Sequence, residues 1–246
     1  MQLSKRLQSV ANLVTKGQRV ADIGCDHAYT SIYMVKKEIA THVIAMDINK
    51  GPLEKAKANV KAYRYEDIIE TRLSDGAKKL EVGEVDALLI SGMGGALMIK
   101  ILSERMDVFH SLNEVILQPQ AEIHLVRKFL HEQGFSIIQE IFLKEDGKYY
   151  VAMKAKNLRN MQEDERAKVV AQYGDSYDKE CFYYYGKLLL EKKQEVLHEF
   201  LNREIRMRQE IVESLKEMKT ENTMKRREEL NKELQILEEA CTIYNK

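Results

Sequence analysis

Short apolar runs alternate with helical segments over the first part of the chain. Runs of Val, Ile, Leu and Ala, each too short for a buried helix, are separated by stretches with helical periodicity. The predicted strands are 19–24, 42–48, 69–74, 87–91 and 115–118, and the predicted helices are 30–37, 51–63 and 122–133. Apolar strands that alternate with helices indicate a parallel sheet covered on both faces.

The pattern changes after the fifth predicted strand. Two strand-like runs, 135–144 and 148–155, are separated by the acidic turn Glu145-Asp146-Gly147, which predicts an antiparallel hairpin. By analogy between folds, such a hairpin at the end of a parallel sheet distinguishes Rossmann-like methyltransferases from nicotinamide-binding domains. We therefore predict an α/β fold with a Rossmann-like class I methyltransferase sheet over residues 1–159.

From about residue 160 the sequence is helical throughout, and 160–246 is predicted to be a separate domain. One set of apolar residues follows a seven-residue frame, interrupted by Gln194, Glu204 and Arg208: Leu190, Leu197, Leu201, Ile211, Leu215 and Met218. A second set has an uninterrupted 4-3 spacing: Leu230, Leu234, Leu237, Cys241 and Tyr244. With a reversal at 220–223, these sets predict an antiparallel coiled-coil hairpin. The alternative is two ordinary surface helices that pack on the first domain.

Composition narrows the class of protein. Lys plus Arg and Asp plus Glu both total 39, so the net charge is zero and does not itself indicate a nucleic-acid partner. Three widely spaced cysteines form neither a disulfide framework nor a metal site. The first residues contain no apolar segment typical of a secretory signal, and no run approaches about 18 apolar residues, so we expect neither secretion nor membrane insertion. We expect a cytoplasmic protein that binds neither a membrane nor a metal.

The end of the first predicted strand carries a single glycine between two aspartates. Gly24 allows the backbone to turn close to a ligand. A dinucleotide would need a glycine-rich loop without adjacent anions, whereas Asp22 and Asp26 would repel a diphosphate. The two carboxylates suit a cofactor with an ammonium and a sulfonium group, and S-adenosyl-L-methionine has both.

Three further motifs follow the next three strands. Asp47 is placed to accept both hydroxyls of a ribose, although a helix cap is an alternative role. Asp75 is placed to accept the adenine amine, or serves only a turn, and Gly92-Met93-Gly94 admits a ligand to the sheet edge. Four such motifs at carboxyl ends of strands together predict a ligand site. The predicted cofactor-binding residues are Asp22, Gly24, Cys25, Asp47, Ile48, Asp75, Gly76, Gly92, Met93 and Gly94.

These motifs carry a family resemblance. DIGCDHAY, AMDIN, SDG, SGMGG and LQPQ, in this order and before a helical tail, resemble the bacterial tRNA (adenine(22)-N1)-methyltransferase family. The resemblance covers the whole chain, and GCDHAY together with SGMGG is specific for the family. It implies methyl transfer from S-adenosylmethionine to N1 of adenine 22 in tRNA. It also implies a C-terminal coiled coil that helps to hold the tRNA.

The residues after the fourth strand agree with methylation of a ring nitrogen. Methyltransferases of exocyclic amines commonly carry an Asn/Asp-Pro-Pro-aromatic segment there, and enzymes that methylate pyrimidine C5 need a nucleophilic cysteine; residues 92–95 contain neither. A ring nitrogen with an in-plane lone pair needs mainly proximity and alignment. The predicted catalytic residues, which would position the adenine, are Asp26, His27, Tyr29, Gln118 and Gln120.

Basic clusters are the candidates for contact with the tRNA backbone, although any one cluster is more often a solvated face. They are Lys5/Arg6, Lys16/Arg19, Lys55/Lys57/Lys61/Arg64, Lys154/Lys156/Arg159, Lys192/Lys193, Arg203/Arg206/Arg208 and Lys225/Arg226/Arg227. Three alternatives stay open: a methyltransferase of proteins or small molecules with a dimerising tail, a non-catalytic scaffold, and a nicotinamide oxidoreductase. A monomer is favoured.

Overall fold

The computed structural model describes residues 3–174, 177–216 and 220–246. The chain divides into two compact units. The first contains Met1–Ile141 and Tyr150–Asp175, and the second contains Phe142–Tyr149 and Ser176–Lys246.

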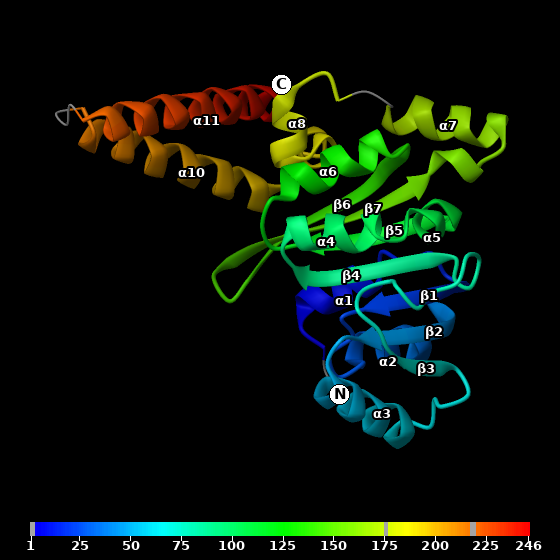
Figure 1. The fold of residues 1–246 in the computed structure, drawn as a ribbon. Coiled ribbons are helices and arrows are strands. Elements are labelled where there is room, and N and C mark those ends of the chain that lie inside the picture. Colours follow the sequence, from blue (N-terminus) through cyan, green and yellow to red (C-terminus); the bar gives the residue numbers. More distant parts are fainter. Residues whose placement is uncertain (1–2, 175–176, 217–219) are drawn as a thin grey trace. The chain divides into compact units, whose positions relative to one another are not determined.

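A seven-stranded sheet with the order β3-β2-β1-β4-β5-β7-β6 organises the first unit (Figure 1). Its strands are β1 (Gln18–Ile23), β2 (Ala40–Asp47), β3 (Ile69–Leu73), β4 (Ala87–Met93), β5 (Glu114–Pro119), β6 (Phe135–Glu145) and β7 (Lys148–Asn157). The first five strands pair in parallel, and β7 runs antiparallel to β5. The predicted parallel sheet and its terminal hairpin are confirmed.

Two groups of helices cover the sheet. Helices α1 (Lys5–Ala11), α2 (Tyr29–Lys36) and α3 (Lys50–Ala62) share a buried apolar cluster with β1 and β2. The other helices of this unit are α4 (Gly95–Ser103), α5 (Met106–Ser111), α6 (Ile123–Glu132), the 3-10 turn η1 (Leu158–Asn160) and α7 (Glu163–Tyr173). Because the chain runs outward from β1 to β3 and then crosses to β4, right-handed crossovers put α4 and α6 on the opposite face.

Sequence patterns did not predict α1, α4 or α5. Helices α1 and α5 have only 7 and 6 residues, too few for a visible period. Helix α4 is almost entirely apolar and begins at Gly95, the last glycine of SGMGG, so neither periodicity nor a polar cap marks its start.

The second unit contains a pair of long antiparallel helices. Besides the hairpin tip 142–149, its elements are α8 (Glu180–Tyr185), α9 (Lys187–Glu191), α10 (Glu195–Ser214) and α11 (Glu221–Asn245). Arg208 Nε donates to Glu233 at 2.8 Å, and the His198 ring stacks on Tyr244 at 4.9 Å between centroids, which fixes the antiparallel direction. Six apolar residues of the two helices are buried: Leu197, Leu201, Leu230, Leu234, Leu237 and Ala240.

The apolar frame predicted for the first long helix is only partly right. Leu190 lies in α9, because Lys193 takes a positive φ of 49° and separates that turn from α10. Ile211 is 41% exposed, and Met218 lies outside the described residues. The reversal predicted at 220–223 is wrong: the Thr220 side chain accepts from the Thr223 amide and caps the start of α11. The coiled coil itself stays a prediction.

No helix within the described ranges is long and apolar enough to cross a membrane.

Gly95 provides a test of how closely the start of α4 packs against residues 121–122. A Cβ at this position would lie 2.6 Å from the Ala121 carbonyl oxygen and 2.8 Å from that of Glu122, both of which are backbone atoms. We expect Gly95→Ala to lower the free energy of unfolding by about 1–3 kcal/mol, because the backbone must shift to admit the methyl group. Urea denaturation followed by circular dichroism measures this.

Gly51 in α3 is the matched control, because nothing lies within 4 Å of its Cβ position. Gly51→Ala should leave stability unchanged or raise it by up to about 1 kcal/mol, through helix propensity. Equal effects of the two substitutions would show that the contact of α4 with 121–122 is not tight.

Candidate cofactor and substrate site

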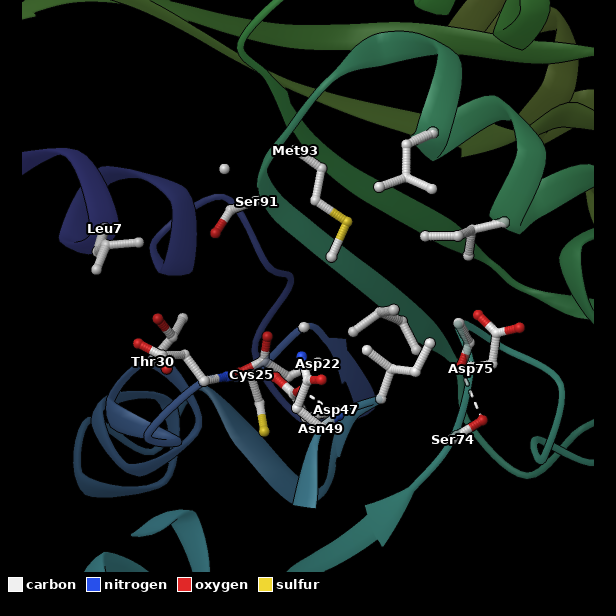
Figure 2. Close-up of a pocket in the computed structure, with 18 of the residues that line it drawn as sticks. Leu7, Asp22, Cys25, Thr30, Asp47, Asn49, Ser74, Asp75, Ser91 and Met93 are labelled. Carbon is white, nitrogen blue, oxygen red and sulfur yellow. Dashed lines mark hydrogen bonds between the residues drawn. The ribbon is translucent and has the colours of Figure 1, made fainter. Parts of the chain in front are cut away.

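A cavity of about 480 Å³ opens at the carboxyl ends of the parallel strands (Figure 2). Nine of the ten predicted cofactor-binding residues line it: Asp22, Gly24, Cys25, Asp47, Ile48, Asp75, Gly76, Gly92 and Met93. The tenth, Gly94, is the N-cap of α4 and does not line the cavity. Of the predicted catalytic residues, Asp26 and Tyr29 line the cavity, whereas His27, Gln118 and Gln120 do not.

The turn after β1 brings the backbone close to the end of β4. Gly24 has a φ of 73°, and a Cβ there would lie 2.3 Å from Cε of Met93. The amides of Gly24 and Cys25 both donate to the Met46 carbonyl, at 2.8 and 2.9 Å, which ties the turn to β2. Asp26 also has a positive φ, 51°. A residue with a side chain at position 24 would therefore be strained and would displace Met93.

Asp47 is held in place by backbone donors. Its Oδ1 accepts from the Asn49 amide at 2.8 Å and its Oδ2 from the Asp26 amide at 3.3 Å, and the residue is 8% exposed. The N-cap of α3 is Asn49, so Asp47 does not serve as the cap that sequence reasoning held open. Each carboxylate oxygen has a second lone pair, so the group can also accept ligand hydroxyls.

Asp22 is a buried carboxylate at the base of the cavity. The residue is 3% exposed, and the Ser31 hydroxyl donates to its Oδ2 at 2.6 Å. Burial raises the pKa of Asp22 to about 6, the Ser31 hydrogen bond limits the rise, and the nearby negative charge of Asp47 adds to it. A carboxylate in such surroundings is stabilised by a bound cation.

The segment after β3 is both a turn and part of the cavity wall. Gly76 has a φ of 58°, and the Ser74 hydroxyl donates to its carbonyl at 2.9 Å. The Asp75 carboxylate pairs with Lys78, which lowers the pKa of Asp75. The two roles that the sequence allowed for Asp75, in a turn and in binding a ligand, are therefore compatible with each other.

Gln118 has a different place from the one predicted. Its side chain is fully buried, and Oε1 accepts from Arg6 Nη1 at 2.5 Å and from the Gly92 amide at 3.1 Å. It therefore holds Arg6 and the end of β4 and does not reach into the cavity. Arg6 lines the cavity, although sequence reasoning had placed it among the RNA-backbone clusters.

His27 and Gln120 do not line the cavity but lie beside residues that do, Asp26 and Gly92. The His27 ring lies beside Asp26, with Nε2 3.4 Å from Oδ1, and its carbonyl accepts from Asn59 Nδ2 at 2.9 Å. Gln120 is exposed, and its Nε2 lies 3.7 Å from the Cβ position of Gly92.

Lys154 is removed from the candidates for RNA contact, because it is 7% exposed and pairs with Glu114 at 3.2 Å.

Sequence reasoning missed several residues of the cavity wall that come from helices and from the Asn49 turn: Leu7, Thr30, Asn49, Leu97 and Ile101. Among the described residues, no group of three or more His, Cys, Asp or Glu side chains is arranged to hold a metal ion.

Comparison with known proteins gives consistent matches. Residues 3–153 match the family described as the methyltransferase domain. A tRNA (adenine(22)-N(1))-methyltransferase from Bacillus subtilis is 39% identical over 155 residues, which are 63% of this chain and 65% of that relative. The alignment thus spans slightly less than two thirds of the length of the curated relative.

Solved structures match over nearly the full length. The B. subtilis M1A22 tRNA methyltransferase TrmK has a TM-score of 0.83 and 32% identity, covering 97% of this chain and 98% of that one. A Streptococcus pneumoniae putative tRNA (m1A22) methyltransferase in complex with S-adenosyl-L-methionine has a TM-score of 0.77 and 28% identity, covering 97% and 99%. The similarity to solved structures therefore includes the C-terminal helices.

The hydrogen bond from Ser31 to Asp22 can be tested by titration. We expect Ser31→Ala to raise the pKa of Asp22 above about 6, because the hydroxyl donates to the ionised carboxylate and stabilises it. Carboxyl carbon NMR over a pH series measures the value, and Asp22→Asn assigns the signal. Ser103→Ala, at an exposed position in α4, is the control and should leave it unchanged. A pKa near the ordinary 3.9 in the unmodified protein would contradict the burial argument.

Proposed function

Since the chain belongs to the methyltransferase domain family, and within it to the TrmK-like bacterial tRNA (adenine(22)-N1)-methyltransferases, we propose that it methylates N1 of adenine 22 in tRNA, with S-adenosylmethionine as methyl donor. The observation that carries the proposal is the acidic cavity at the ends of four parallel strands, in which Asp47 is held by two backbone amides. An open α/β sheet binds its ligand at this edge.

The residues present fit this cofactor. The fixed carboxylate of Asp47 accepts the two ribose hydroxyls, and Asp75, on the neighbouring strand end, accepts the adenine amine. Asp22, buried beneath the cavity, provides the negative charge that an ammonium or sulfonium group needs. When bound, S-adenosylmethionine supplies a methyl carbon attached to a positively charged sulfur.

Methyl transfer moves the positive charge from the sulfur of the donor to the adenine base. The lone pair of adenine N1 forms the new nitrogen–carbon bond, the carbon–sulfur bond breaks, and its electron pair stays on the sulfur. No proton has to leave N1 first, so the protein needs to align the reactants more than to supply a base. Asp26 lines the cavity with an exposed carboxylate, which would stabilise the positive charge that develops on the adenine.

Tyr29 offers a surface for the target base. It lines the cavity, is 39% exposed, and begins α2 directly after the turn that carries Asp26. A nucleotide presented in a single-stranded or opened form can stack on such a ring. We assign Tyr29 to base stacking, and His27 and Gln120 to contacts at the rim.

The proposal extends to the rest of the chain. We propose that residues 160–246 form a tRNA-binding domain and that residues 1–159 carry out the chemistry. The residues of this chain that line the cavity all precede residue 102, which supports this division, and we propose that the protein acts as a monomer. We place the protein in the cytoplasm, where tRNA is available.

The deciding experiment is methyl transfer with labelled S-adenosylmethionine and an unmodified tRNA transcript that has adenine at position 22. We expect label in 1-methyladenosine, and none when position 22 is guanine. Label in another nucleoside, or only in protein, would refute the proposed activity.

Asp47→Ala should weaken S-adenosylmethionine binding by about 1.5–3 kcal/mol in calorimetry, as for lost hydrogen bonds to a charged group. Asp67→Ala, in an exposed turn, is the control and should leave the affinity unchanged.

The tRNA-binding role of the tail predicts a salt effect. Replacing Lys192, Lys225 and Arg227 together by alanine should raise the Kd for tRNA and flatten its dependence on salt, because fewer counterions are released. The charge-conserving variant, with Lys192→Arg, Lys225→Arg and Arg227→Lys, should bind like the unmodified protein. S-adenosylmethionine affinity should be unchanged in both. An unaltered Kd and salt slope in the alanine variant would show that these three residues do not contact the RNA.

A further inference from the structure

Exposed apolar side chains gather around the mouth of the cavity. In the described part of the first unit, the exposed large apolar residues are Tyr29, Ile48, Val82, Leu97 and Leu125. Tyr29, Ile48 and Leu97 line the cavity, whereas Val82 lies in the turn that leads into β4. Single exposed apolar residues are common, but a group of them beside a ligand site indicates a surface that a partner covers.

The segment after β5 is bonded to the segment after β4, which forms part of the cavity wall. Three hydrogen bonds join them: the Gln120 amide donates to the Met93 carbonyl at 2.9 Å, the Gly95 amide to the Ala121 carbonyl at 3.0 Å, and the Ala96 amide to the Glu122 carboxylate at 2.8 Å. Glu122 has a positive φ of 51°, and such strain in a residue with a side chain clusters at functional sites. Helices α4 and α6, which begin here, lie side by side (Figure 1). Their starts form one fixed edge beside the cavity.

The exposed surface of this edge is apolar and is flanked by cations. Leu97 and Leu125 are each the third residue of their helix, and they are 49% and 40% exposed. We call the exposed apolar residues here the α4–α6 ridge: Ala96, Leu97, Ala121 and Leu125. Lys100 and Lys128 follow about one turn further along, and each forms only a long ion pair of 3.9 Å within its own helix, which contributes little. Apolar groups between ammonium groups fit a nucleic acid, in which base faces lie between phosphates.

The ridge lies on the side of the site that the cofactor leaves open. We place the cofactor over the ends of β3, β2 and β1, where Asp75, Asp47 and Asp22 follow one another in the sheet. The next strands in the order are β4 and β5, and the two helices of the ridge follow these strands directly. An adenine that approaches the methyl group over β4 therefore passes beside the ridge.

The reaction requires the target base to leave its helix. N1 is the hydrogen-bond acceptor on the Watson–Crick edge of adenine, so its lone pair is engaged while the base is paired. Enzymes that act on such an atom withdraw the nucleotide from the stack, which costs unpairing and unstacking energy. An apolar side chain that enters between the neighbouring bases replaces part of the lost stacking.

We propose that Leu125 fills the space that the target adenine leaves in the RNA helix when this base enters the cavity and stacks on Tyr29. The inference rests on the proposed function, because it takes an adenine of tRNA as the substrate. Leu125 does not line the cavity, so it contacts the RNA helix while the cavity holds the withdrawn nucleotide. The hydrogen bonds of segment 120–122 hold it in place before the RNA binds, which lowers the entropic cost of insertion.

The test uses two tRNA transcripts that differ only opposite adenine 22, where one has a uridine, which pairs with the adenine, and the other has an abasic site. Leu125→Ala should slow single-turnover methylation of the paired transcript roughly 10- to 100-fold, the scale of the cost of unpairing and unstacking one base. The abasic transcript should lose less than about 3-fold, because no pair has to be broken. Leu125→Met, which keeps an apolar side chain of similar volume, should behave like the unmodified protein on both.

A fluorescence measurement follows the withdrawal of the base without the chemical step. The probe is 2-aminopurine in place of adenine 22 in the paired transcript, since its emission rises when it leaves a stack. With S-adenosylhomocysteine present, the unmodified protein should raise the emission at saturation, and Leu125→Ala should raise it less. The affinity for S-adenosylmethionine should be unchanged. Val82→Ala, at an exposed apolar position outside the cavity wall, is the matched control and should alter neither rate nor emission.

The other outcomes separate this inference from the proposed function. If Leu125→Ala slows both transcripts equally, the residue serves the folding of α6 and the inference is wrong. If both rates and the emission are unchanged, the inference is also wrong, and a change in sedimentation would then show that the ridge joins copies of this chain. If the unmodified protein methylates adenine 22 in neither transcript, the proposed function itself fails.

Discussion

The parallel pairing of β1 with β2 on one side and β4 on the other is the constraint on which the site depends. In this register Ile23, the last residue of β1, is opposite both Met46 and Ile90, which lie one and three residues before the ends of β2 and β4. Their following residues therefore lie at one edge, and the β1 turn is fastened there by the Met46 carbonyl. A one-residue slip in either pairing would move Asp22 to the other face of the sheet.

This constraint explains why three acidic residues of the cavity could be predicted from sequence to lie together. Asp22, Asp47 and Asp75 each lie in or directly after a strand that local apolar patterning reveals. Parallel topology then brings the strand ends together without further information. The prediction needed only the existence and order of the strands, and the fold and the placement of these residues followed.

The opposite end of the cavity could not be predicted in this way. Arg6 and Gln118 are 112 positions apart, and α1 gives no periodic signal. Without that partner, a glutamine at the end of a strand looks like a polar group facing a ligand, whereas it is buried. Lys154 was misjudged for a similar reason, since its pairing with Glu114 depends on the register of β7 against β5. In the tail, a single positive φ at Lys193 divides what the apolar spacing presented as one helix.

The burial of Asp22 has a thermodynamic consequence for ligand exchange. Below pH 6 its carboxyl is largely protonated in the free protein, and a cationic ligand stabilises the ionised form. Binding in mildly acidic solution therefore expels a proton, and the heat observed depends on the ionisation enthalpy of the buffer. As the pH rises above the pKa of about 6, the group is increasingly ionised before the ligand binds, and fewer protons are released. The ligand and the hydrogen ion compete for one carboxylate, and acidification of the surroundings favours the empty site.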